Sequence, residues 1–254
     1  MAELITYKSL IAGLFLLVLF IAERYVPAVT VPEEIVTVRR ITNNLLLWLC
    51  NSLLSPVIIL PVTLYAIHYG LSWRNDLLVG WGGLLLDILA LDLWIYWWHR
   101  ANHSIPLMWR FHRIHHLDRW LDVTSSVRFH FCEVILSALV RALVVVSLGI
   151  PLLSVIVFET LVLVNAGFHH SNIRLPKNLE HIVSKLIITP SAHWMHHHIV
   201  QQDTDSNYGV IFSFWDRLFG SQSNNQRTAD MEIGLKHSQD VSLVQLMISP
   251  FMSR

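Results

Sequence analysis

Long apolar stretches separated by short polar segments run through the first part of the chain. They cover residues 4–22, 45–67 and 77–98. About 20 apolar residues in a helix cross the roughly 30 Å hydrocarbon core of a membrane, so each stretch is predicted to be a spanning helix. A cleaved signal peptide is the alternative for the first stretch. It is disfavoured because Glu23 and Arg24 follow directly, without an obvious small-residue cleavage site.

The second apolar stretch contains two prolines, and a hairpin follows further along the chain. Pro56 and Pro61 each remove a backbone donor, which predicts a kink or a split into two helices. Residues 134–149 and 152–168 are shorter apolar stretches joined by an Ile-Pro turn. So short a connection predicts an antiparallel helical hairpin that enters the membrane deeply without necessarily spanning it.

Two opposite charges lie inside this hairpin. Arg141 and Glu159 are each about nine residues from the turn, so they reach matching depth. An unpaired charge inside a membrane is expensive, and we therefore predict that the two side chains form an ion pair.

The composition supports a membrane protein. Hydrophobic residues make up 54% of the chain and charged residues 14%, against about 25% charged residues in soluble domains. The predicted fold class is all-α: a multi-pass membrane helix bundle of about three spanning segments plus the hairpin. A histidine-rich cap is expected on the cytoplasmic face. The chain, residues 1–254, is expected to form a single integral membrane domain.

Charge distribution gives an orientation. Arginines gather after the third stretch, and cytoplasmic loops are enriched in arginine and lysine, so this end is predicted to be cytoplasmic. The basic residues after this stretch are Arg100, Arg110, Arg113, Arg119 and Arg128. Counting back along the stretches, the loop with Arg39 and Arg40 is also predicted to be cytoplasmic, and the amino terminus to lie on the opposite side. Because the formal net charge is zero, no nucleic-acid partner is expected. Cys50 and Cys132 are read as free thiols.

Fifteen histidines are present, and most fall in three clusters. Side chains at i, i+3 and i+4 share one face of a helix. Two clusters have all three positions, and the first is an i, i+4 pair. Imidazole is the commonest protein metal ligand, and the number of histidines exceeds the four that one tetrahedral ion needs. The clusters therefore predict two metal ions. Their members are His99, His103, His112, His115, His116, His193, His196 and His197.

The hairpin adds two further histidines. His130 lies about twenty residues before the turn and His170 about twenty after it, so folding back returns both to the face that carries the clusters. Metal ligation and an ordinary role stay equally open for these two. His169 and His198 adjoin candidate ligands, but neighbours on a helix point in different directions, and we leave them out of the ligand set.

The helix that leads into the first cluster carries a polar stripe. Asp92, Tyr96, His99 and His103 are spaced by four, three and four residues and share one face. Asp92 either accepts the ring N–H of a ligating histidine, which fixes the tautomer, or pairs with a nearby arginine. Asp92 and Tyr96 are the candidate catalytic residues.

Several motifs follow one another between residues 87 and 220. They are Asp92-x3-Tyr96-x2-His99-Arg100-x2-His103, Trp109-Arg110-Phe111-His112-x2-His115-His116, Arg128-Phe129-His130-x2-Glu133, Phe168-His169-His170 through Pro176, His193-x2-His196-His197, Asn207-Tyr208-Gly209 and Trp215-Asp216-Arg217-Leu218-Phe219-Gly220. In this order they resemble the fatty acid hydroxylase/sterol desaturase superfamily of membrane histidine-box di-iron oxidases. One departure is Phe131, which stands where proline is common in the family.

The resemblance implies an integral membrane, non-haem di-iron oxidase. Such an oxidoreductase uses O2 and two electrons to hydroxylate or desaturate a C–H bond of a lipid substrate, either a sterol, a fatty acyl chain or a related lipid. Two Fe2+ ions would be bound by the clustered histidines, with His130 and His170 matching further family histidines, and zinc is an alternative occupant of the purified protein. No His-Pro-Gly-Gly haem signature is present, so a separate electron donor is expected: a cytochrome b5-like protein, a ferredoxin or a reductase.

On this reading the domain divides into three regions. They are the N-terminal membrane helices in 4–76, a catalytic region in 77–220 and a C-terminal tail in 221–254. Two alternatives remain. An acyl desaturase of the other membrane histidine-box superfamily is disfavoured by the motif at 215–220. A histidine-rich membrane metal-binding or haem-binding protein without oxidase activity would need ligands deep within the spans or along a pathway, whereas these histidines lie at the ends of the apolar stretches.

Overall fold

The computed structural model describes residues 2–32, 34–35, 37–74, 79–237, 239 and 241–252. Its helices, in chain order, are α1 (Ala2–Tyr25), α2 (Val38–Leu54), the π-helix η1 (Ser55–Ile59), α3 (Leu60–His68), α4 (Gly80–Ser104), α5 (Pro106–His116), the 3-10 helix η2 (Val123–Val127), α6 (Phe131–Leu148), α7 (Leu152–His170), α8 (Lys177–Val183), α9 (Pro190–His196), α10 (Gln201–Thr204), α11 (Phe214–Leu218), α12 (Leu243–Ile248) and the 3-10 helix η3 (Ser249–Phe251).

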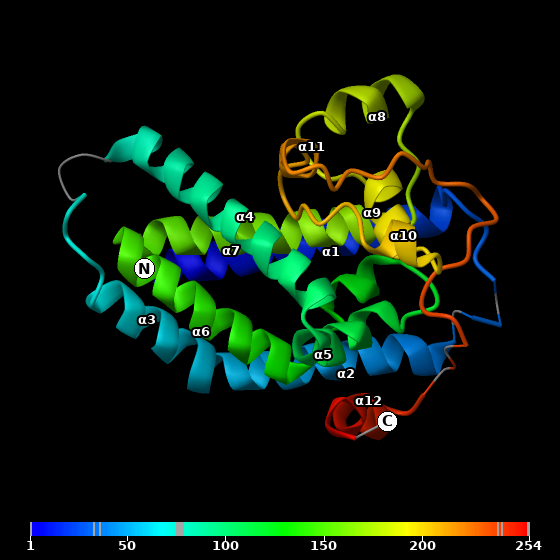
Figure 1. Cartoon of the computed structure of the whole chain (residues 1–254), viewed down its shortest axis with the longest axis horizontal. Coiled ribbons are helices and arrows are strands. Elements are labelled where there is room, and N and C mark those ends of the chain that lie inside the picture. Colours follow the sequence, from blue (N-terminus) through cyan, green and yellow to red (C-terminus); the bar gives the residue numbers. More distant parts are fainter. Residues whose placement is uncertain are drawn as a thin grey trace.

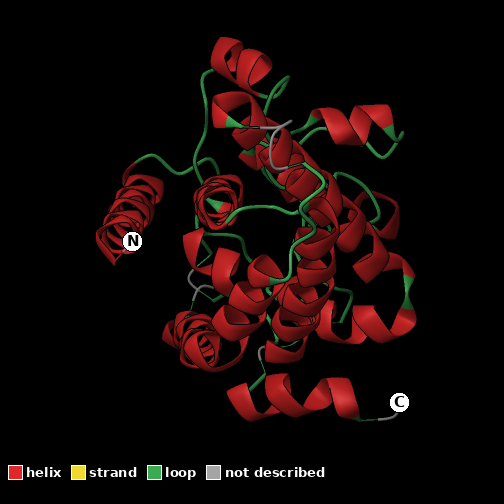
Figure 2. Cartoon of the chain, turned by 90° about the vertical axis from the view of Figure 1, so that its left-hand side faces the viewer, coloured by secondary structure: helices red, strands yellow, loops and turns green. Residues whose placement is uncertain are grey.

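Long helices form a bundle, and the short helices gather at one end of it (Figure 1). α1 packs along α7, and α3 packs along α6. Among the described residues there are isolated β-bridges but no strand, and Figure 2 shows helices joined by loops. The all-α prediction is therefore confirmed for the described part of the chain.

Three helical segments among the described residues are long and apolar enough to cross a membrane. They are Val38–His68, Phe131–Leu148 and Leu152–His170. α4 carries most of the predicted third stretch but is not among them, because Asp87 and Asp92 lower its hydropathy. The first two residues of that predicted stretch, 77 and 78, lie outside the described residues. α4 packs against α5, α6 and α7 and delivers its last turns to the histidine-rich end.

The prolines of the second stretch distort the helix without dividing it. α2, η1 and α3 follow one another without a break from Val38 to His68. Pro56 lies in the first turn of the π-helix, whose wider turn accommodates the missing backbone donor. The expected kink is thus a local widening of one continuous helix.

The predicted hairpin is present. α6 ends at Leu148, and α7 begins at Leu152 after a tight turn. Gly149 caps α6 in the left-handed conformation (φ 59°), and a Cβ atom there would lie 2.2 Å from the carbonyl oxygen of Leu71. Only glycine fits this position, and it lets the connection after α3 pack directly against the hairpin tip.

The predicted ion pair across the hairpin is also confirmed. Nη2 of Arg141 lies 3.0 Å from Oε1 of Glu159. Beyond this pair, towards the turn, α3, α4, α6 and α7 bury a shared apolar core. Its buried members are Ala66, Ile88, Leu91, Val145, Ile150, Val155, Phe158 and Ile211.

A buried charge network supports the opposite, histidine-rich end. Arg40 is buried at the start of α2 and donates hydrogen bonds to Asp118, to Asp122 and to the carbonyl of Trp120. Arg128 is buried too, and it donates to the carbonyl of Ile114. Because these two arginines are buried in the network, they do not contribute to the surface charge from which the membrane orientation is predicted.

Candidate metal centre

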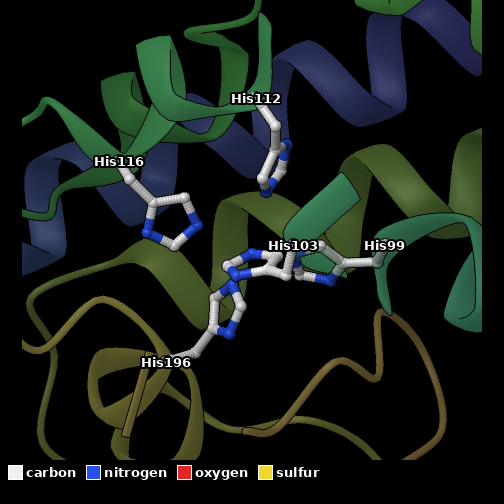
Figure 3. Close-up of side chains that lie close together, drawn as sticks. All are labelled: His99, His103, His112, His116 and His196. Atoms are coloured by element: carbon white, nitrogen blue, oxygen red, sulfur yellow. The ribbon is translucent and has the colours of Figure 1, made fainter. Parts of the chain in front are cut away.

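Five histidines from three helices form a first group. They lie at the end of α4, along α5 and at the end of α9, and each offers one ring nitrogen within 4.8 Å of the others. Figure 3 shows their rings turned toward one another. The members of this first histidine group are His99, His103, His112, His116 and His196.

Four more histidines form a second group beside the first. The second histidine group consists of His115, His170, His193 and His197. Its Nε2 atoms make a chain of short contacts, because the Nε2 of His170 lies 3.0 Å from that of His115 and 3.1 Å from that of His193. The two groups adjoin where the rings of His116 and His197 stack with centroids 4.2 Å apart.

α5 divides its histidines between the two groups because successive residues on a helix diverge by about 100°. His112 and His116 are one turn apart and face the first group, whereas His115 faces the second. α9 makes the same division, with His196 in the first group and His193 in the second. The i, i+3, i+4 spacing therefore serves two adjacent sites.

Backbone carbonyls fix the ring orientation of two members of the first group. The Nδ1–H of His99 donates to the carbonyl of Tyr208 (2.9 Å), and the Nδ1–H of His196 donates to the carbonyl of Ser206 (2.7 Å). A carbonyl accepts only, so the proton is on Nδ1 and the lone pair is on Nε2. Both rings thus present an electron pair to the centre of the group.

A carboxylate performs the same task for a third member. His112 Nδ1 lies 2.8 Å from Oε1 of Glu133, which also accepts from the side-chain amide of Asn102. A carboxylate on the outer nitrogen of a ligating histidine fixes the tautomer and raises the basicity of the inner nitrogen. This role is one of the two considered for Asp92, and in the structure the carboxylate at His112 is that of Glu133.

The inner nitrogens of the first group have no hydrogen-bond partner within the described part of the chain. Buried polar atoms without a partner are costly and rare, so a set of them converging on one point indicates a ligand. The atoms are the Nε2 atoms of His99, His103, His112, His116 and His196. All five are imidazole nitrogens, the donor type that suits iron and zinc.

The second group also fits a metal ion. Nitrogens bound at about 2.1 Å to one ion, at right angles, lie about 3 Å from each other. The contacts of 3.0 Å and 3.1 Å at His170 match this spacing, as does the 3.2 Å between the Nε2 atoms of His197 and His193. The residues present therefore fit two ions, one in each group.

Burial keeps most of these imidazoles neutral. Burial lowers the pKa of His196 to about 3. It also lowers the pKa values of other cluster members well below 6.5, with neighbouring imidazoles adding to the effect; these are His99, His103, His115, His116, His193 and His197. Neutral imidazole is the form that binds metals, so the environment holds the ligands ready at ordinary pH.

Of the two histidines predicted from the hairpin, His170 joins the second group and His130 joins neither. His130 precedes α6 and caps it, because its Nδ1 accepts from the backbone N–H of Cys132 (3.2 Å). Its Nε2 donates to the carbonyl of Met247 (3.0 Å). Both ring nitrogens are thus engaged elsewhere, and the structure does not bring His130 together with the other nine predicted ligands.

Asp92 takes neither of the two roles considered for it. Its carboxylate accepts hydrogen bonds from the backbone N–H groups of Ile211 (3.1 Å) and Phe212 (3.0 Å) and from Nε1 of Trp215 (2.9 Å). Asp92 thereby holds the loop after α10 against α4. It acts on the histidines only through the position of that loop.

Asp216 anchors the same loop from the other side. It accepts from the backbone N–H groups of Tyr208 (2.8 Å) and Gly209 (2.9 Å), which places the Tyr208 carbonyl against His99.

Tyr96 lies behind this loop. Its hydroxyl is 2.7 Å from Oγ of Ser221, and it does not line the cavity described below. Neither predicted catalytic residue touches the space in front of the histidines.

A cavity of about 450 Å³ opens from both histidine groups into the bundle. His99 and His112 of the first group, and three members of the second, line one end of it. The sides are mainly apolar and come from η1, α4, α6 and α7, and include Ile59, Trp94, Ile95, Trp98, Val134, Ala138, Phe158, Val162 and Leu163. An apolar cavity thus adjoins both histidine groups.

His169 also lines this cavity, although its position next to His170 led us to leave it out. It is buried, and its ring centroid lies 4.0 Å from that of His193. His198, the other histidine left out, points away and bonds Asp203 instead (2.8 Å). His169 and His198 each adjoin a candidate ligand in the sequence, so spacing alone does not distinguish them. The three-dimensional structure does, because only His169 is among the cavity-lining residues.

Comparison with known proteins identifies the region that carries these groups. The family model described as fatty acid hydroxylase matches residues 84–221. No solved structure matches the chain.

Similar curated proteins include three lipid-modifying enzymes. Ornithine lipid hydroxylase OlsE of Rhizobium tropici is 27% identical over 169 residues, which is 66% of this chain and 50% of that protein. Lathosterol oxidase of Rattus norvegicus is 30% identical over 149 residues (56% and 46%). Alkylglycerol monooxygenase of Xenopus tropicalis is 29% identical over 136 residues (54% and 29%). The matched region thus spans about half the length, or less, of these relatives.

Proposed function

Because the chain belongs to the fatty acid hydroxylase family, we propose that it is an integral membrane, non-haem di-iron oxidase. It would hydroxylate or desaturate a C–H bond of a lipid with O2 and two electrons. The observation that carries this proposal is the junction of two buried histidine groups with one end of an apolar cavity. The names of the similar proteins, which include a lipid hydroxylase and a sterol oxidase, agree with a lipid substrate.

The nine histidines would hold two iron ions, one in each group. Bound there, the irons would supply the activation of O2 that attack on an unactivated C–H bond requires. The chain itself would hold the protons away from the metal-facing nitrogens. The carbonyls of Ser206 and Tyr208 and the carboxylate of Glu133 keep three imidazoles in the Nδ1–H tautomer.

The cavity would position the lipid and exclude water. Its aromatic and aliphatic walls, for example Trp94, Trp98 and Phe158, favour a hydrocarbon chain over water. Exclusion of water protects a reactive oxidant from side reactions and fixes which carbon lies nearest the histidines. The lipid would enter sideways from the bilayer, between the helices that form the walls.

We further propose that the histidine end faces the cytoplasm. Arg40 and Arg128 are buried and drop out of the charge count, but the exposed Arg110 and Arg119 remain beside the histidines, with Arg100 partly exposed. Positive residues favour the cytoplasmic side. A separate electron donor, such as a cytochrome b5-like protein, a ferredoxin or a reductase, would then approach this end of the bundle.

Metal analysis and lipid analysis of the purified protein test the proposal together. We expect about two irons per chain, no Soret absorption, and a new hydroxylated or desaturated lipid that forms only when O2 and an electron source are supplied. A Soret band would support the alternative of a haem-binding membrane protein. Bound metal without any oxidised lipid, in cells and with the purified protein alike, would support a metal-binding protein without oxidase activity.

A further inference from the structure

The ion pair of the hairpin lies on the wall of the cavity. Arg141 and Glu159 both line it, together with the histidines. The Arg141 side chain is 12% exposed and the Glu159 side chain 34% exposed, so the pair is accessible from the cavity without being open on all sides. Both residues belong to helices apolar enough to span a membrane, where a charge without a function is rare.

The pair marks the end of the cavity that is farthest from the histidines. On α6, Arg141 is the last cavity-lining residue, eight positions after Glu133, which contacts His112. On α7, Glu159 precedes His170 by eleven positions. A helix rises about 1.5 Å per residue, so the pair and the histidines are separated by about 12 to 16 Å along the helices.

A further polar side chain lies near the pair. Ser137, one turn before Arg141 on α6, also lines the cavity. The wall between this level and the histidines is mainly apolar, with Val134, Ala138 and Val162 among its residues. The cavity is therefore divided into a metal-binding end, an apolar middle and a polar end.

We propose that the Arg141–Glu159 pair is a subsite for an uncharged hydroxyl group of the lipid. This inference rests on the proposed function and narrows its substrate class. The substrate would carry a hydroxyl about 12 to 16 Å from the carbon that is oxidised. Arg141 and Glu159 would thus determine which lipid binds and which carbon faces the histidines, without touching the reacting atoms.

The chemistry of the pair favours a hydroxyl over other groups. A hydroxyl both donates and accepts, so it can donate to the carboxylate of Glu159 and accept from the guanidinium of Arg141. A lipid carboxylate would meet Glu159 with a like charge, because that residue already neutralises Arg141. A plain hydrocarbon end would cover two charged groups without bonding to either.

A binding experiment that requires no turnover tests the subsite. Radiolabelled hexadecanol would be bound to zinc-loaded protein in detergent, with its methyl ether and palmitate as competitors. The ether keeps the chain and the oxygen acceptor but lacks the O–H donor. We expect the wild-type protein to prefer the alcohol over the ether by roughly tenfold, the size of one hydrogen bond to a charged group. Palmitate should bind more weakly than the alcohol.

Two variants make the test specific. The double variant Arg141→Leu with Glu159→Leu removes both charges together, so no single charge is left buried, and the preference for the alcohol should disappear. Glu159→Gln leaves Arg141 without a neutralising charge and should shift the preference toward palmitate by roughly tenfold. Thr160→Val is the matched control, because Thr160 is adjacent to Glu159 but does not line the cavity.

The possible outcomes separate the two proposals. Equal binding of alcohol and ether by the wild-type protein, or an unchanged preference in the double variant, would overturn the subsite. So would tighter binding of palmitate than of alcohol by the wild-type protein. A clear alcohol preference in a protein that forms no oxidised lipid with iron, O2 and electrons would instead overturn the oxidase. Oxidised lipid without any alcohol preference would retain the oxidase and remove the subsite.

Discussion

The two histidine groups differ in how firmly the protein holds their rings. In the first group, backbone carbonyls and Glu133 fix the outer nitrogens of His99, His112 and His196. In the second group, the Nε2 atoms contact one another. Within the described part of the chain, only His170 has its Nδ1 held, by the carbonyl of Ala166 at 2.8 Å.

The outer nitrogens of the rest of the second group, those of His115, His193 and His197, are buried and without a partner among the described residues. The comparison teaches that the first group is preorganised by the protein, whereas the second depends more on a bound ion to order it. Three members of the second group line the cavity, against two of the first. The less restrained group is thus the one that contributes more residues to the cavity wall.

Removal of one histidine from either group should have the largest effect. His115→Ala and His196→Ala are each expected to lower turnover at least about a thousandfold, because loss of one metal removes several kcal/mol of transition-state stabilisation. The iron content should fall from about two to about one per chain while the protein stays in the membrane. Product analysis and iron quantitation measure both effects.

His198→Ala is the matched control, since His198 lies outside both groups and bonds Asp203. It should leave iron content and turnover close to those of the wild-type protein. Retained turnover in His115→Ala would remove His115 from the ligand set.

Acid should destabilise the metal-free protein more than the metal-loaded protein. Burial lowers the folded-state pKa of several cluster histidines, His115 among them, well below the ordinary 6.5, and that of His196 to about 3. Below about pH 6.5 the unfolded chain therefore binds more protons than the folded chain. The free energy of unfolding then decreases as the pH is lowered. Thermal unfolding of chelated protein should show a falling midpoint between about pH 7 and about pH 5.

Bound metal competes with these protons and should move the loss of stability to lower pH. If the chelated protein unfolded at the same temperature throughout that interval, the histidines would not be held neutral by burial. Because the first group is held by hydrogen bonds, reloading with limiting metal should restore its occupancy before that of the second group.

Loss of Glu133 should weaken the first group selectively. Glu133→Ala is expected to lower metal affinity there by roughly 10- to 100-fold, the usual effect of removing a carboxylate behind a ligating histidine. Glu133→Gln should recover part of the loss, because its amide oxygen still accepts from His112. Metal titration of each variant measures the two affinities.

Asp230→Asn serves as the control for a lost carboxylate, because Asp230 lies on the surface. An equal loss of affinity in both groups of Glu133→Ala would indicate general unfolding and would contradict a specific role at His112.

The smallest effect is expected at Asp205. Its Oδ1 lies 3.4 Å from Nδ1 of His103, a long contact, and its side chain is 42% exposed. Weak, solvated contacts of this kind contribute little, so Asp205→Asn should change metal affinity by less than about threefold. A change as large as that in Glu133→Ala would show that the first group is held from both sides.

The hairpin and the histidine clusters could be predicted because both depend on local spacing. The Ile-Pro turn fixes the register of α6 and α7, so the pairing of Arg141 with Glu159 follows from counting residues. Helical spacing likewise places His112 and His116 on one face of α5, but it does not reveal that His115, on the next face, reaches a separate group.

Other contacts depend on how helices are rotated against one another, which local spacing does not encode. Asp92 and Glu133 are both carboxylates close to histidines in the sequence. Only the packing of α6 on α5 brings Glu133 to His112, while Asp92 faces the loop around Ile211. His130 had a suitable position along the chain, but as the residue before α6 it caps that helix instead.

The apolar core at the hairpin tip has a consequence for the length of the lipid. On α6 and α7, no residue nearer the turn than Arg141 and Phe158 lines the cavity, and Val145, Ile150 and Val155 pack together in the buried core there. Gly149 brings that tip against the backbone of Leu71. A bound molecule would therefore end at this core, which would set an upper limit on its reach. A chain too long for this blind pocket would place a different carbon at the metals or fail to bind.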